Sequence, residues 1–329
     1  LECDGNDLAV LDLSYNKYLE YLLCTGNPSL KTVYLSQGCT IPHLEKDSFT
    51  QFYYREGINI KDMAFKKYLV ARFDTDGDKE ISEAEAATVS EIEVCTDNIF
   101  SLSGIEHFVN LKKLVCMGTF EDEYGPNNYH GVLSELDVSH NTQLEFLSCG
   151  YNQLNSIDVS KNTQLKILRF QNNNVTSIDV SQNHLLEDLV FRYCHLSSLD
   201  LSNNHELEGL DCQGGNGYNR IKSIDVSGCP KLSLLNCNSV GLETIDVSHN
   251  PQLTWLGIVE SVFSTIDLSS NPHINCLYAN VNSLSEIDLT HNPDVEYLYV
   301  RDSPKLNIVY IKAGQTIPNI FRSEERRVG

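Results

Sequence analysis

The sequence predicts a solenoid of stacked, short β-strands with little helix in the array. A tetrad of the form Ile/Leu-Asp-Val/Leu-Ser/Thr occurs eight times between residues 136 and 290, and successive tetrad aspartates are 21, 21, 21, 25, 21, 21 and 21 residues apart. Each repeat also carries apolar residues at fixed positions that a single coil could not bury alone. Stacking the coils would join these residues into one continuous core.

Each repeat has the same apolar pattern. Leu144, Leu147, Cys149, Asn152 and Leu154 spell L-x-x-L-x-C-x-x-N-x-L. This pattern resembles the leucine-rich repeat family, whose signature is L-x-x-L-x-L-x-x-N/C-x-L. The resemblance covers residues 92–311 and also 1–35. Because the tetrad half of the repeat fits the same pattern, we expect two extended segments per coil, joined by tight turns.

An asparagine follows most tetrads, and its position has a structural explanation. A side-chain amide can satisfy backbone groups where the coil leaves its extended segment. Cys229 occupies the equivalent place in the fifth copy, so we expect that rung to be altered. The expected ladder comprises Asn141, Asn162, Asn183, Asn204, Asn250, Asn271 and Asn292.

The tetrad aspartates should also align from coil to coil. They could form a strip that binds cations, or a solvated edge whose carboxylates accept hydrogen bonds from turn amides and serine hydroxyls. Their near-invariance along the array favours the solvated edge, since a recognition surface should vary. The aspartates concerned are Asp12, Asp137, Asp158, Asp179, Asp200, Asp225, Asp246, Asp267 and Asp288.

A longer period overlies the first. Residues 1–44 match residues 277–320 at 17 of 44 positions, an offset of 276. The start of the chain therefore resembles the end of a preceding module, and a coil cut at Leu1 would expose an apolar end that favours end-to-end self-association. We expect four parts: residues 1–50 as the terminal part of a preceding module with its cap, 51–91 as a helical segment, 92–320 as a solenoid with its C-terminal cap, and 321–329 as a tail.

The helical segment is predicted to contain a calcium loop. Residues 60–73 have apolar spacing near 3.6, typical of a helix. Residues 74–85, DTDGDKEISEAE, resemble an EF-hand loop. Calcium binds six to eight oxygen atoms, which such a loop supplies from alternate positions. The ligand positions of the loop are occupied by Asp74, Asp76, Asp78, Glu80 and Glu85.

The loop departs from the family pattern at one position. The sixth residue is normally Gly, because the backbone there has a positive φ. Here Lys79 occupies that place and Gly77 stands two residues earlier. Two interpretations stay open: a structural calcium site, or a helix–loop–helix cap without metal.

The cysteines fit the repeat. Six of the eleven occupy the inward position that phenylalanine, isoleucine, valine or alanine holds in other coils, so we interpret them as free thiols that pack in the core. Spacings typical of zinc ligands do not occur. These six are Cys3, Cys24, Cys116, Cys149, Cys212 and Cys237.

The positions that flank the L-x-C segment vary in every coil, and this variation predicts a recognition face. Trp, Tyr and Arg are enriched at binding hot spots, and all three types occur there. The alternatives are an ordinary variable surface, or a concave strand on the tetrad side as the family consensus allows. The candidate residues are Phe146, Arg169, Arg192, Asp211, Trp255, Tyr278, Tyr299 and Arg301.

Charge and motifs exclude several functional classes. Lys plus Arg number 24 against 45 for Asp plus Glu, and the net charge of −21 disfavours binding to nucleic acid or anionic membranes. The sequence has no apolar run of roughly 18 residues that would form a transmembrane segment. Motifs of nucleophilic, phosphate-binding or metal-dependent catalysis are absent, so we expect a protein that is not an enzyme.

The 21-residue repeat together with the EF-hand-like segment resembles leucine-rich repeat surface proteins of the Bacteroides type. That resemblance implies an exported protein, located extracellularly or at the outer cell surface. It also implies a module that binds a protein or glycan on host or dietary material. The alternative is a structural spacer in a tandem surface protein, rigidified by calcium.

Overall fold

The computed structural model describes residues 1–14, 16, 18–36, 38–55, 57–119, 130–215 and 217–322. The chain divides into two compact units, one formed by Leu1–Val89 with Leu102–Phe108 and the other by Ser90–Ser101 with Val109–Gly329. The four-part division predicted from the sequence stays a prediction, and most of its tail lies outside the described residues.

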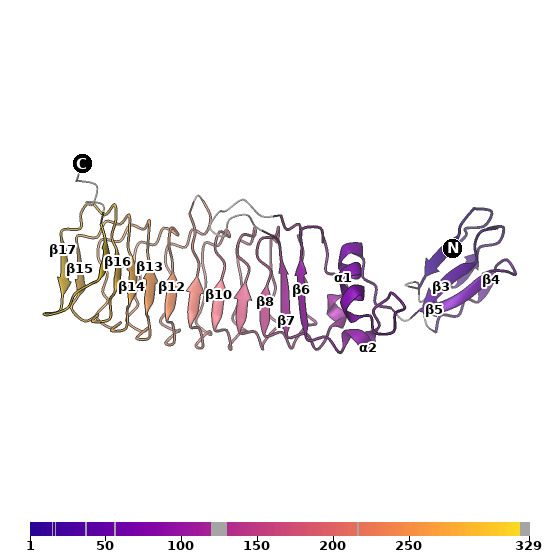
Figure 1. Cartoon of the computed structure of the whole chain (residues 1–329), viewed down its shortest axis with the longest axis horizontal. Coiled ribbons are helices and arrows are strands. Elements are labelled where there is room, and N and C mark those ends of the chain that lie inside the picture. Colours follow the sequence, from indigo (N-terminus) through magenta and orange to yellow (C-terminus); the bar gives the residue numbers. More distant parts are fainter. Residues whose placement is uncertain are drawn as a thin grey trace. The chain divides into compact units, whose positions relative to one another are not determined.

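The second unit is a solenoid built on one parallel sheet, in which each strand pairs with the strands of the coils before and after it (Figure 1). This confirms the predicted fold class. The strands of the sheet are β6 (Glu91–Cys95), β7 (Lys113–Met117), β8 (Phe146–Ser148), β9 (Ile167–Arg169), β10 (Asp188–Val190), β11 (Gly209–Asp211), β12 (Leu234–Asn236), β13 (Trp255–Gly257), β14 (Cys276–Tyr278), β16 (Tyr297–Tyr299) and β18 (Asn319–Phe321).

The alternation of side chains along each strand decides which residues form the core. Leu147 is the centre of β8, pairs in register with Leu168 of β9 and is fully buried. Cys149, two residues on, is also fully buried. Phe146 points the other way and is only half-buried. Since successive side chains lie on opposite faces of a strand, one apolar column fills the coil and the variable residues remain outside.

The tetrad segments do not form the second continuous set of strands that we expected. Among the described residues of the second unit, a tetrad forms a strand only in β15 (Glu286–Leu289), which pairs with β17 (Ile308–Ile311). The tetrad aspartate accepts a local backbone N–H in both situations: the amide of Ser139 donates to Oδ1 of Asp137, and the amide of Thr290, next to β15, donates to Oδ1 of Asp288, both at 2.9 Å. This hydrogen bond is therefore a feature of the turn and does not decide whether the tetrad forms a strand.

The predicted asparagine ladder is confirmed. Asn162 is fully buried, and its Nδ2 donates to the carbonyl oxygens of Val138 and Asn141 in the preceding coil, both at 2.9 Å. Asn183 repeats the arrangement on Val159 and Asn162 at 3.1 and 2.9 Å. Each amide thus satisfies two buried carbonyls of its neighbour, which would otherwise cost stability.

The described residues of the first unit form five short strands in two parallel sheets. Its core lies around Leu22, Leu30 and Val33, which are fully buried. The order of the larger sheet is β1-β3-β5, and β2 pairs with β4. The strands are β1 (Val10–Leu13), β2 (Tyr21–Leu23), β3 (Thr32–Ser36), β4 (His43–Glu45) and β5 (Gln51–Arg55).

The helical segment also belongs to the first unit. Helix α1 (Met63–Phe73) begins three residues later than predicted, because Asp62 caps it by accepting hydrogen bonds from the amides of Ala64 and Phe65. Helix α2 (Glu83–Ala86) begins with a capping box, and the 3-10 helix η1 spans Ile105–His107. None of the helices in the described part of the chain is long and apolar enough to cross a membrane.

The asparagine ladder yields a paired prediction. Replacing Asn183 with Ala leaves two buried carbonyls without donors, which should cost about 1–3 kcal/mol for each. Cys229 holds the same backbone place, with its amide 3.0 Å from the carbonyl of Val226. Cys229→Asn should therefore raise stability, because the new amide faces the carbonyls of Leu201 and Asn204. The midpoint of urea unfolding measures both changes, and a lower midpoint for Cys229→Asn would contradict the assignment.

Candidate functional site

The outward residues of the sheet form two columns that run from coil to coil. Parallel strands lie about 4.8 Å apart, so neighbours within a column can contact each other. The first column contains Phe146, Ile167, Asp188, Gly209, Leu234, Trp255, Cys276, Tyr297 and Asn319. The second contains Ser148, Arg169, Val190, Asp211, Asn236, Gly257, Tyr278, Tyr299 and Phe321.

Four aromatic side chains from four neighbouring strands form what we call the aromatic strip: Trp255, Tyr278, Tyr299 and Phe321. The ring centroids of Trp255 and Tyr278 are 5.2 Å apart at an interplanar angle of 37°. Tyr278 and Tyr299 stack at 4.0 Å and 8°, and Tyr299 and Phe321 stack at 4.3 Å and 7°. Gly257 makes room for the indole, since a Cβ there would lie 2.5 Å from Cη2 of Trp255.

The stacking determines what the strip offers to a partner. Tyr278 and Tyr299 turn their faces toward neighbouring rings, so ring edges and hydroxyl groups are the parts left for a partner. A hydrogen bond with Tyr299, together with burial, raises the pKa of Tyr278 above its usual value. The strip is therefore an ordered surface that needs little reorganisation before it binds.

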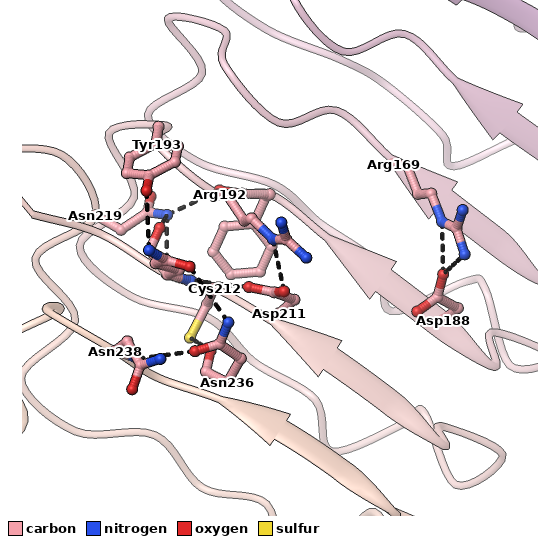
Figure 2. A network of polar contacts seen from close by, with 11 residues as sticks. Arg169, Asp188, Arg192, Tyr193, Asp211, Cys212, Asn219, Asn236 and Asn238 are labelled. Carbon is pink, nitrogen blue, oxygen red and sulfur yellow. Dashed lines mark hydrogen bonds and ion pairs between the residues drawn. The ribbon is translucent and has the colours of Figure 1, made fainter. Parts of the chain in front are cut away.

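The other half of the face carries ion pairs rather than stacked rings. Nε and Nη2 of Arg169 both lie 2.7 Å from Oδ2 of Asp188 on the next strand (Figure 2). Nε of Arg192 lies 2.6 Å from Oδ2 of Asp211. Burial raises the pKa of Asp211 even though the Arg192 guanidinium acts in the opposite direction. Phe146 lies at the end of this group, with its ring centroid 6.0 Å from Cζ of Arg169.

Further polar side chains hold the ion pairs in place. Nε2 of Gln213 donates to the hydroxyl of Tyr193 at 2.9 Å, and Nδ2 of Asn236 donates to Oε1 of Gln213 at 3.4 Å. The amide of Gln213 donates to Oδ1 of Asp211. Figure 2 shows this network continuing to Asn238, whose amide donates to Oδ1 of Asn236. Several coils therefore fix the position of the Asp211 carboxylate.

The structure divides the eight predicted face residues into two groups. The charged half contains Phe146, Arg169, Arg192 and Asp211, and the aromatic half contains Trp255, Tyr278, Tyr299 and Arg301. Cζ of Arg301 lies 5.5 Å from the ring centroid of Phe321. Sequence reasoning missed Phe321, because the last coil is one residue longer and places this residue 22 positions after Tyr299 in β18.

The predicted calcium loop brings its three aspartates together. One carboxylate oxygen each from Asp74, Asp76 and Asp78 lie within 4.8 Å of one another. Lys79 has a φ of 69°, so it adopts the left-handed conformation that this loop position normally reserves for Gly. Its amide donates to Oδ2 of Asp74 at 3.0 Å. Ile81 is fully buried, and its carbonyl accepts from the amide of Ile58 at 2.8 Å.

The side chains of the two predicted glutamate ligands make contacts of their own. Oε2 of Glu80 is 2.6 Å from Nζ of Lys66. Oε1 of Glu85 accepts from the amide of Thr75 at 2.6 Å, and Oε2 accepts from that of Ser82 at 2.9 Å. Burial would raise the pKa of Glu85, but the hydrogen bonds from Ser82 and Thr75 outweigh it and lower the pKa to about 2.

The tetrad aspartates make the hydrogen bonds expected of a solvated edge. Oδ1 of Asp179 accepts from the amide of Ser181 at 2.9 Å, and the side chain is exposed. Asp200 repeats this with Ser202. These hydrogen bonds hold the pKa of each carboxyl below its usual value, although neighbouring aspartates act in the opposite direction on Asp179.

Five of the six predicted inward cysteines are buried in the core, and Cys3 is half-buried. Cys116, Cys149, Cys212 and Cys237 are fully buried thiols. Sγ of Cys212 lies 3.5 Å from Sγ of Cys237 on the next coil. Burial raises the pKa of Cys116 to about 12, so this thiol is protonated at neutral pH and unreactive.

The stacked coils, the parallel sheet and the asparagine ladder define a leucine-rich repeat solenoid. The structure is similar to the functional domain of InlJ from Listeria monocytogenes, a domain that includes a cysteine ladder. Sequence identity is 25% and the TM-score is 0.58, with 78% of this chain matched to 61% of that one. This chain therefore spans less than two thirds of the length of the InlJ domain.

Two further solved structures show lower similarity. The internalin InlF of Listeria monocytogenes is 16% identical with a TM-score of 0.48, covering 81% of this chain and 92% of that one. A leucine-rich repeat protein of Leptospira interrogans is 17% identical with a TM-score of 0.46, covering 63% and 62%. No family model and no curated protein matches the sequence.

The tetrad carboxylates predict a pH dependence. The pKa values of these carboxyls are lower in the folded chain than their ordinary value of 3.8. The carboxylates therefore stabilise the folded chain when the pH is above 3.8. This stabilisation is lost as the pH falls through the pKa of the folded state. The midpoint temperature of thermal unfolding should therefore decrease as the pH is lowered from about 5 to about 3. Asp179→Asn with Asp200→Asn should make that fall shallower. The exposed Glu243, which lies outside the tetrads, provides the control Glu243→Gln; an equal flattening by this control would contradict the prediction.

Proposed function

We propose that this chain is a secreted or cell-surface binding module whose outer sheet face recognises a protein partner. The observation that carries the proposal is the aromatic strip, four ordered rings on adjacent strands beside a second group of fixed Arg–Asp pairs. Aromatic and arginine side chains contribute most of the energy of protein interfaces when they are ordered before binding.

The shape of the strip favours a protein over a glycan. A sugar ring stacks on an open aromatic face, whereas Tyr278 and Tyr299 use their faces on each other. The surroundings are apolar as well: Leu234 is 39% exposed and Tyr297 is 37% exposed in the neighbouring column. An apolar centre beside a polar group is the usual organisation of a protein interface.

A second function, that of a spacer rigidified by calcium, is favoured by the loop at residues 74–85. The residues fit the ion: three carboxylates converge, and Lys79 already holds the backbone conformation of an EF-hand loop. Asp74, Asp76 and Asp78 would hold calcium, and Glu85 would join them by exchanging its hydrogen bonds with Thr75 and Ser82. Bound calcium would fix α1 and α2 relative to the loop.

The binding proposal predicts a loss of affinity when the strip is removed. A Trp255→Ala, Tyr278→Ala double mutant should bind a protein partner at least about tenfold more weakly, because hot-spot truncations cost about 2 kcal/mol or more. Partners would be found by probing arrays of extracellular proteins and of glycans with the whole chain. Asp158→Asn, on the exposed tetrad edge, is the matched control and should bind normally. Unchanged binding by the double mutant, or hits among glycans only, would overturn the proposal.

The calcium proposal predicts a change in stability. Millimolar calcium should raise the melting temperature of the first unit relative to chelator, and Asp76→Asn should abolish most of that shift. Lys79→Gly should tighten calcium binding, because it relieves a left-handed backbone costing roughly 1 kcal/mol and removes a positive charge. Identical melting curves with calcium and with chelator would contradict the calcium proposal and leave the proposal for the binding face untouched.

A further inference from the structure

The two halves of the 276-residue period have the same secondary structure. Adding 276 to β1, β2 and β4 gives the bounds of β15, β16 and β18, and β3 falls on β17 with one residue more at its end. The turns agree too: Gly38 and Gly314 both have a positive φ, of 74° and 82°. The chain therefore contains the same capping unit twice, each time with a parallel pair of strands on the tetrad side.

One strand distinguishes the two copies. In the first, β5 joins the pair as a third parallel strand, with Val33 opposite Phe52 and Tyr34 opposite Tyr53. In the second, β17 pairs with β15 alone among the described residues. In the described part of the chain, the equivalent edge of β17 therefore has no counterpart of β5.

Burial differs accordingly between matching side chains. Leu35 is 2% exposed in the first copy, and its counterpart Ile311 is 43% exposed. Leu30 is fully buried, while Leu306 is half-buried. Tyr310, the counterpart of the half-buried Tyr34, is 44% exposed. The second copy keeps the apolar residues that β5 covers in the first, although there they face solvent.

The contacts of β5 show what an occupant needs. Phe52 packs against the core of the first unit. Oγ1 of the buried Thr50 donates to the carbonyl of Leu30 at 2.9 Å, and the amide of Gln51 donates to that of Lys31 at 2.9 Å. Both acceptors are backbone groups, so Leu306 and Asn307 carry the same acceptors in the second copy.

We propose that β17 is an acceptor edge for a third parallel strand of the β5 type, supplied from the C-terminal side of the cap. The register of the first copy places Phe52 of such a segment opposite Val309, and Tyr53 opposite Tyr310. Backbone hydrogen bonds would hold the strand, and the aromatic side chain would select it. An open edge with an apolar row otherwise invites unspecific pairing.

A graft tests this directly. Residues 323–329 are replaced by a copy of residues 47–57, so that Arg322 takes the place of Lys46 before the new strand. Hydrogen exchange at the amides of Val309 and Ile311 should slow by about tenfold or more, because alternate amides of β17 face the edge where the new strand pairs. Exchange in β8–β12 should stay unchanged, which shows that the rest of the solenoid is intact.

The matched control is the same graft with Phe52→Asp in the grafted copy, which should give no protection. The proposal is overturned if the graft leaves exchange at Val309 and Ile311 unchanged, or if both grafts protect equally. If the grafted chain misfolds, a synthetic peptide of residues 47–57 is added to the unaltered chain. Protection of the same amides by millimolar peptide supports the proposal, and its absence overturns it. The binding face is not altered in any of these variants.

Discussion

The buried asparagine amide is the interaction on which the rest of the solenoid depends. In Asn271, Nδ2 donates to the carbonyls of Val247 and Asn250 in the preceding coil, at 2.8 and 2.9 Å. Apolar burial drives the coils together, but it has no direction and would accept many registers. The asparagine amide is compatible with only one register. A shift of a single residue would leave buried carbonyls unpaired and turn the central leucines outward. The asparagines therefore fix the register between neighbouring coils.

A second set of buried amides acts on the other side of each strand. Nδ2 of Asn173 donates to the carbonyl of Cys149 at 3.0 Å, and Nδ2 of Asn282 donates to that of Ile258 at 2.8 Å. Cys194 holds one of these places with its thiol, 3.3 Å from the carbonyl of Phe170. Most sheet strands are thus fixed at both ends by donors inside the core, while Val240 holds this place in one coil without a side-chain donor. The outer columns inherit that precision, and rings on neighbouring strands can stack as closely as Tyr278 and Tyr299 do.

Features that recur in every coil could be predicted from the sequence, and features made between coils could not. The fold and the asparagine ladder followed from the 21-residue spacing, and the variability of the positions that flank the L-x-C segment remains the basis for predicting a recognition face. The pairing of Arg169 with Asp188 and of Arg192 with Asp211 was missed, although both pairs are 19 residues apart, which is one coil less two positions. Phe321 was missed because the last coil is longer. The left-handed backbone of Val281 could not be predicted from its residue type, since valine rarely adopts this conformation and the neighbouring coils impose it.

The ends of the stack follow a different rule from its middle. An inner coil is completed by its neighbours, whereas a cap is completed by whatever follows it, and the two caps of this chain have similar sequences with different exposure. The higher exposure of Ile311 compared with Leu35 therefore reflects the strand that covers the first cap, and not a difference between the two coils themselves. Phe321, the last ring of the aromatic strip, belongs to the same final coil as β17. A strand that covered β17 would add contacts to that coil, so the covering of the cap and the end of the candidate binding face belong to one packed unit.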